Sequence, residues 1–76
     1  MNHSLKEIID NPKKYKICIS CGLFSWHEKE KCHYCGSMVF MNKPKAIKQK
    51  AKDDFRYLIG KCGYTKEAAE GNRVDV

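Results

Sequence analysis

Residues 18–36 read CISCGLFSWHEKEKCHYCG, so two CxxCG units lie close together in a chain of 76 residues. The first unit begins at Cys18 and the second at Cys32, with ten residues between the two pairs of cysteines. Two residues between paired cysteines allow a tight turn that aims both sulfur atoms at one point. The glycine that follows can adopt the positive φ that such a turn often needs. Two turns of this kind can supply four ligands to one ion.

The spacing of these cysteines predicts a closed metal site. Four thiolates at about 2.3 Å from Zn²⁺ are typical of a structural site, which has no open position for catalysis. The expected ligands of one structural zinc ion are Cys18, Cys21, Cys32 and Cys35. His27 and His33 are alternative ligands because imidazole also binds zinc. We expect both rings at the surface instead.

The length of the chain makes a metal important for folding. The core of a domain below ~70–80 residues rarely supplies more than ~3–5 kcal/mol, whereas a structural zinc ion contributes ~10–16 kcal/mol. The odd number of cysteines, five, argues against a disulfide framework. The N-terminal residues lack the apolar run of a secretion signal, and no segment has the length of a membrane span. We therefore expect a cytoplasmic, metal-stabilised protein with no membrane partner.

The two CxxCG units resemble the knuckle pair of the zinc-ribbon superfamily. The resemblance covers about residues 15–41 and implies a small fold around one zinc ion. Zinc ribbons occur in transcription factors, RNA-polymerase subunits, ribosomal proteins and phage proteins, so the resemblance implies a nucleic-acid or protein partner. A weaker similarity, to the short rubredoxin-like modules of rubrerythrins, would imply redox-active iron. Those modules typically have proline after the third cysteine and an acidic surface, whereas this chain has His33 and basic flanks.

The fold class expected from the chain is a small α+β fold in three segments. Residues 1–14 predict a short helix and a basic linker, because Ser4 and Glu7 form a capping box and Asn11-Pro12 ends the helix. Residues 15–41 form the expected ribbon, with a short antiparallel sheet. Its first strand, residues 15–19, would bury Tyr15, Ile17 and Ile19 on one face. Residues 38–41 form its second strand, and a loop carrying Trp26 and His27 lies between them.

The third segment, residues 42–76, predicts an amphipathic helix that begins near Pro44. Its apolar stripe consists of Ile47, Ala51, Phe55, Leu58 and Cys62. Cys62 is therefore expected to be a buried small side chain rather than a fifth ligand. The helix ends near two glycines, and Thr65 caps a final short helix. We expect residues 72–76 to be frayed.

The positive charge of the chain is concentrated in the third segment. The net charge is +6, and residues 42–56 carry +4 of it, whereas residues 18–41 are neutral. Four cations lie on the helix face opposite the apolar stripe: Lys45, Lys48, Lys52 and Arg56. Lys43 precedes them in the sequence. Lys50 is expected to pair with Asp54 one turn later. Such a field favours an acidic partner, nucleic acid first.

The combinations of side chains that are typical of an enzyme's active site are not recognisable in the sequence. No nucleophile with a base, no paired carboxylates in an apolar context and no phosphate-binding glycine loop are recognisable, so we expect neither catalysis nor a small-molecule substrate. Trp26 could stack on a base, although packing against the C-terminal helix is the favoured interpretation. The first hypothesis is a nucleic-acid-associated regulator or subunit of a transcription or ribonucleoprotein machine. The alternatives are an adaptor that docks on a larger protein complex and a rubredoxin-like electron carrier.

Overall fold

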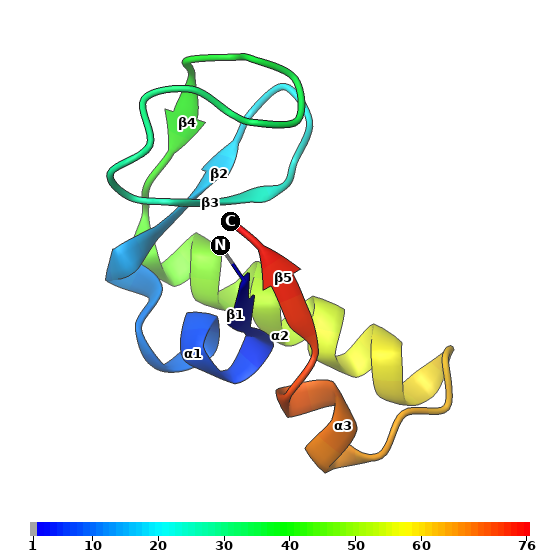
Figure 1. Ribbon diagram of the computed structural model, residues 1–76. Coiled ribbons are helices and arrows are strands. Elements are labelled where there is room, and N and C mark those ends of the chain that lie inside the picture. The colour runs from blue at the N-terminus through cyan, green and yellow to red at the C-terminus, as the bar shows by residue number, and fades with distance from the viewer. Residues whose placement is uncertain (1) are drawn as a thin grey trace.

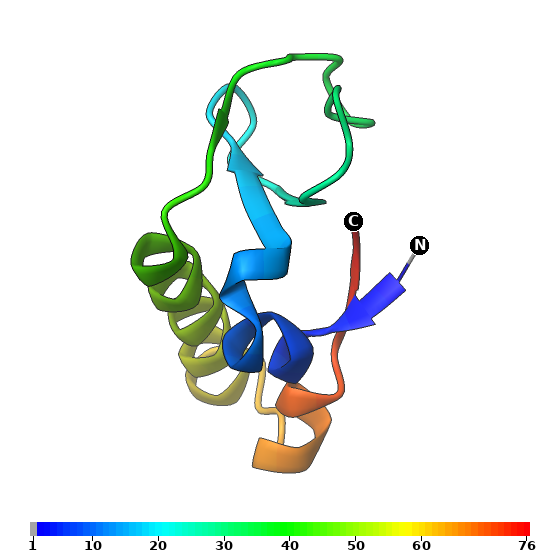
Figure 2. The same ribbon diagram turned by 90° about the vertical axis from the view of Figure 1, so that its left-hand side faces the viewer.

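The cysteine-bearing loops lie on one side of the protein and the helices on the other (Figures 1 and 2). The computed structural model describes residues 2–76. Two short antiparallel sheets complete a small α+β fold. None of the helices described in residues 2–76 combines the length and the apolar composition that a membrane span requires.

The helices begin where the sequence predicts. Helix α1 spans Leu5–Asp10, and the Ser4 hydroxyl accepts a hydrogen bond from the Glu7 N–H at 3.2 Å. A 3₁₀ turn, η1, follows at Pro12–Lys14. Helix α2 spans Pro44–Gly60, and α3 spans Lys66–Glu70 with Thr65 as its N-cap. The predicted N-caps Ser4 and Thr65 are thereby confirmed. The Glu7 carboxylate, the other half of the predicted capping box, contacts His3 Nδ1 at 3.1 Å.

The sheet below the cysteine loops has three strands in the order β3-β2-β4. The central strand β2, Tyr15–Cys18, pairs with β3, Phe24–Trp26, and with β4, Phe40–Met41. The predicted loop at Trp26 is therefore wrong, because residues 24–26 pair with residues 15–17 in a hairpin. The second predicted strand is shorter than expected, since only its last two residues pair with β2.

The predicted position of Ile19 is also wrong, because 62% of this residue is exposed. Strand β2 ends at Cys18, and the chain then turns into the first CxxC unit. The alternation that buries Tyr15 and Ile17 therefore stops before it reaches Ile19.

The N- and C-terminal segments form a second, two-stranded sheet. Strand β1, Asn2–Ser4, pairs antiparallel with β5, Arg73–Asp75, and the following Val76 is fully buried. The expectation that residues 72–76 are frayed is therefore wrong. Each strand has only three residues, and each finds its partner more than sixty residues away.

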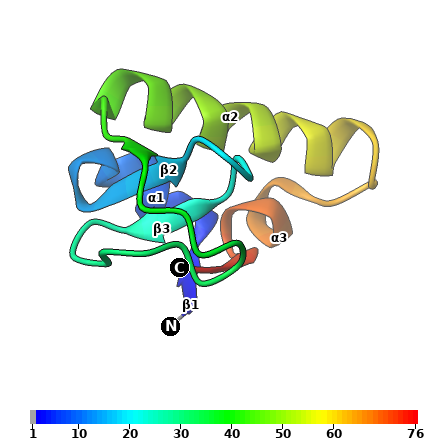
Figure 3. The same cartoon turned by 90° about the horizontal axis from the view of Figure 1, so that it is seen from above.

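One hydrophobic core joins the ribbon strands to the helices. Its buried members come from every part of the fold: Leu5, Ile8, Tyr15, Ile17, Phe24, Ile47, Ala51 and Val76. Helix α2 lies along one side of the protein and contacts α1, α3 and β2 (Figure 3). Phe55 and Leu58 of its apolar stripe pack against this core, as predicted.

Cys62 does not belong to that stripe. Helix α2 ends at Gly60, and Cys62 is exposed in the turn before Gly63, whose φ is +72°. The prediction that Cys62 is buried is wrong because the helix stops before its last predicted member.

Candidate metal centre and basic surface

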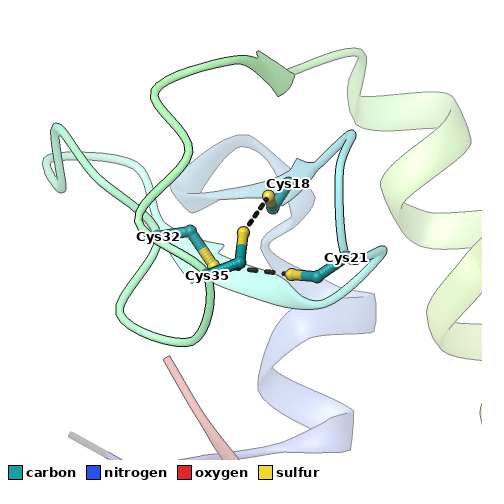
Figure 4. A group of neighbouring side chains, drawn as sticks. All are labelled: Cys18, Cys21, Cys32 and Cys35. Carbon is teal, nitrogen blue, oxygen red and sulfur yellow. Dashed lines mark hydrogen bonds between the residues drawn. The ribbon is translucent and has the colours of Figure 1, made fainter.

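The four predicted ligands lie together at the tip of the ribbon (Figure 4). Their Sγ atoms all lie within 4.8 Å of one another, with 3.4 Å between Cys18 and Cys35 and 3.5 Å between Cys21 and Cys32. A tetrahedral ion with bonds of about 2.3 Å would separate its sulfur ligands by about 3.8 Å. The four thiols are free. The cluster therefore fits a metal ion of the size of Zn²⁺ or iron.

The two CxxCG units adopt the same backbone structure. In each unit the first cysteine donates its N–H to the carbonyl five residues later, and the glycine donates its N–H to the carbonyl of that first cysteine. The two distances are 3.0 and 2.7 Å at Cys18, and both are 2.8 Å at Cys32. Gly22 and Gly36 have φ values of 74° and 75°, which L side chains rarely adopt. The glycine that follows each cysteine pair is thus required by the turn.

The four thiols of the cluster fall into two with a lowered pKa and two with a raised pKa, largely because of the hydrogen bonds around them. Burial opposes ionisation of Cys18, but backbone N–H groups and neighbouring cysteines lower its pKa to about 6. The Cys35 N–H likewise lowers the pKa of Cys32. At Cys21 the Leu23 N–H favours the thiolate, but burial and the neighbouring cysteines outweigh it and raise the pKa to about 12. At Cys35 the Ser37 N–H favours the thiolate, but the hydrogen bond with Cys18, burial and Cys32 outweigh it and raise the pKa. The cluster thus contains two cysteines whose pKa is lowered, Cys18 and Cys32, and two whose pKa is raised, Cys21 and Cys35.

Metal binding should therefore release protons from Cys21 and Cys35, whose pKa values are raised. A metal needs thiolates, so protons compete with it and its affinity falls as the pH falls. Release of at least about two protons near pH 7.5 would raise the association constant at least about 100-fold per pH unit. Calorimetric titration with zinc, in buffers that differ in ionisation enthalpy, measures the number of protons. A metal affinity that is constant between pH 6 and pH 8 would contradict this structure of the thiol cluster.

The two histidines near the cysteines are not part of the cluster. His33 contacts the Lys29 amine through Nδ1 at 3.2 Å and the Asp75 carboxylate through Nε2 at 3.3 Å. The His27 ring lies against Trp26, with 4.7 Å between the ring centroids. The four cysteines are the one cluster of possible metal ligands found within residues 2–76.

A four-cysteine cluster in a small α+β protein is consistent with a zinc-ribbon-like module. No protein-family model, curated protein or solved structure matches this chain.

The predicted cations lie on the exposed side of α2. We define the α2 basic stripe as Lys45, Lys48, Lys52 and Arg56, all of which are exposed. Lys43 is also exposed, at the N-cap of the helix. Lys50 is set apart because its amine contacts the Asp54 carboxylate at 3.3 Å, as predicted. Within residues 2–76 no side chain of the stripe forms an ion pair with a carboxylate.

Trp26 is packed among other aromatic rings. Its indole stacks on His3, with 5.1 Å between centroids and 28° between planes, and meets Tyr15 edge-on at 5.5 Å. Trp26 therefore packs on β1 and β2 and against the hydrophobic core. Since His3 covers one side of the ring, Trp26 is a poor platform for a nucleic-acid base.

Two cations that sequence reasoning missed lie near the α2 basic stripe. Lys6 of α1 and Lys66 of α3 line the same groove as Lys52 and Arg56. The contacts of α1 and α3 with α2 bring these side chains together. No spacing in the sequence could have indicated this, because the residues come from three separate helices.

Proposed function

We propose that this protein is a non-catalytic, zinc-stabilised nucleic-acid-binding module. The α2 basic stripe would contact the phosphates, and the ribbon would hold the fold together. The observation that carries the proposal is the stripe itself, which places four exposed cations along one helix without carboxylate partners among residues 2–76. Lysine and arginine in such an array neutralise phosphates and release counterions, and this supplies most of the affinity of non-specific nucleic-acid binding.

The charge expected at the metal centre also favours α2 as the side of the molecule that binds nucleic acid. A divalent ion held by four thiolates leaves a site with two net negative charges. Apart from its cysteines, the ribbon between residues 18 and 41 has no net charge. With metal bound, the ribbon would repel phosphates while α2 attracts them, so the protein would have one preferred face for nucleic acid.

The metal that this proposal assigns to the cluster is zinc. Purified protein should contain one zinc ion per chain and be colourless, because a closed site of four sulfur ligands is typical of structural zinc. Elemental analysis together with a visible absorption spectrum measures this. Stoichiometric iron with thiolate-to-iron absorption would contradict the zinc assignment and favour the electron carrier.

Binding to duplex DNA should weaken steeply with salt. Four phosphate contacts, each contributing about 0.9, predict a slope of about −3 to −4 in a plot of log affinity against log salt. Fluorescence anisotropy with a labelled duplex measures the slope. Duplexes of different sequence should bind alike, because phosphate contacts carry no sequence information. Absence of salt-dependent binding to DNA or RNA at low ionic strength would overturn the proposal.

A second candidate function, a protein adaptor, is favoured by exposed apolar side chains on the ribbon. Ile19, Met38 and Val39 are 62%, 64% and 59% exposed, and the Ile19 N–H donates to the Val39 carbonyl at 3.2 Å. Contiguous exposed apolar side chains are typical of protein-binding surfaces. Complexes isolated from native lysate with and without nuclease would separate the two functions. Partners lost after nuclease treatment support nucleic-acid binding, whereas partners retained support the adaptor.

A further inference from the structure

A groove of about 380 Å³ lies between α1, α2 and α3, and apolar as well as charged side chains line it. Ile9 of α1 and Phe55 of α2 supply apolar surface, and both are partly buried against the core. The volume falls within the range of about 300–1,000 Å³ that is usual for small-molecule sites. The groove is thus large enough for a flat ring and has an aromatic side chain to receive it.

The charged side chains of the groove favour a specific kind of ligand. Four cations line it, Lys6, Lys52, Arg56 and Lys66. Two of them, Lys52 and Arg56, belong to the α2 basic stripe and lie about 6 Å apart along the helix axis. Phosphates on the stripe would therefore hold the adjoining nucleotide close to Phe55.

Two carboxylates in the groove, those of Asp10 and Glu70, oppose entry of the phosphate itself. A base is uncharged, and an amino group such as that of cytosine can donate a hydrogen bond to a carboxylate. The base of a nucleotide suits the groove better than its phosphate does. Inside a duplex that base would be stacked and paired, so the ligand must be single-stranded.

We propose that the groove accepts an unpaired base of a single-stranded nucleic acid, stacked on Phe55, while the neighbouring phosphates lie on the α2 basic stripe. This inference rests on the proposed function and adds a preference for single strands. Base stacking on aromatic side chains is the usual device of proteins that bind single strands. Phe55 would be the stacking side chain, because His3 already covers one face of the Trp26 indole.

The test uses the whole zinc-loaded protein and three probes of equal length: a single-stranded oligodeoxycytidine, an abasic strand with the same phosphates, and the duplex with oligodeoxyguanosine. The single strand should bind about 5- to 150-fold more tightly than the abasic strand, as expected for one stacked base. Phe55→Leu should bring this ratio close to one, and Phe55→Tyr, which keeps the aromatic ring, should preserve it. Trp26 fluorescence and zinc content verify that both variants are folded.

The possible outcomes separate this inference from the proposed function. Equal affinity for the base-bearing and abasic strands, tighter binding of the duplex, or a ratio unchanged by Phe55→Leu would overturn the groove inference and leave phosphate binding standing. Failure to bind any probe in a salt-dependent manner would overturn both. Binding of polyglutamate in the absence of nucleic-acid binding would assign the groove to an acidic protein partner, which also overturns the inference.

Discussion

Cys32→Ala is expected to abolish metal binding and to unfold the whole protein, not the ribbon alone. Cys32 is buried and is one of the four cysteines positioned to hold a metal ion. The loss of a site worth ~10–16 kcal/mol exceeds what a core of this size supplies, about 3–5 kcal/mol. Tyr15, Ile17 and Phe24 connect the ribbon to the core beneath it, so the helices would lose these packing partners as well.

Helix α1 has six residues and α3 has five. Isolated helices shorter than about 12–15 residues are marginal in water, so α1 and α3 should unfold when the metal is lost. Helix α2, with 17 residues, would at the same time lose the core in which Ile47 and Ala51 are buried, so the helical signal should fall together with the metal. Circular dichroism in the presence of zinc reports the helices, and the fluorescence of Trp26 reports the sheet. The same loss is expected when a strong chelator removes the metal from the unmodified protein.

Cys62→Ala is the matched control for this experiment. Cys62 is the one cysteine outside the cluster and is exposed, so its substitution should leave one metal ion per chain. Exposed substitutions usually change stability by no more than about 0.5 kcal/mol. Loss of metal from Cys62→Ala would show that the ligand set is wrong. Retention of native circular dichroism by Cys32→Ala would show that the core does not depend on the metal.

The double substitution Lys48→Glu/Lys52→Glu is expected to reduce nucleic-acid affinity by at least about 100-fold. A hydrogen bond to a charged group contributes about 1.5–3 kcal/mol, and the two contacts would be replaced by repulsion. The slope of log affinity against log salt should fall by about two. The fold should survive because both side chains are exposed and lie outside the core. Anisotropy titrations at several salt concentrations measure both quantities.

A control with the same change in net charge distinguishes contacts from the overall field. Lys31 lies on the ribbon and Lys61 follows α2, and both are exposed. If the α2 basic stripe contacts the phosphates, Lys31→Glu/Lys61→Glu should weaken binding far less than the stripe variant. Equal losses in the two variants would mean that the net charge, and no particular surface, determines the affinity.

The features predicted correctly from the sequence are those determined by local spacing. The two CxxCG units fix their own turns through hydrogen bonds within five residues, so the cysteine cluster follows from the motif. Helix α2 follows from an apolar repeat over many residues, together with Pro44 at its first position. The position of Cys62 was missed because the same repeat continues past Gly60, where the helix ends.

The features that were missed depend on contacts between distant residues. Strands β1 and β5 have three residues each, too few for an alternating pattern to stand out, and their pairing accompanies the burial of Val76 in the core. The groove beside Phe55 requires three helices to meet. Neither can be found from residue types along the chain, because each residue's partner is chosen by the tertiary fold.

The pairing of β1 with β5 also sets an order of events on the ribosome. All four cysteines of the cluster lie within the first 35 residues, so they are synthesised before α2 and α3. Residues 2–4 cannot pair until residues 73–75 have been synthesised, roughly 2–8 s after residue 35 at about 5–20 residues per second. During that interval α1 lacks the strand and Val76 that complete its surroundings in the finished protein. Leu5 and Ile8 of α1, which are buried in the finished protein, would thus stay exposed in the nascent chain until these later segments are made.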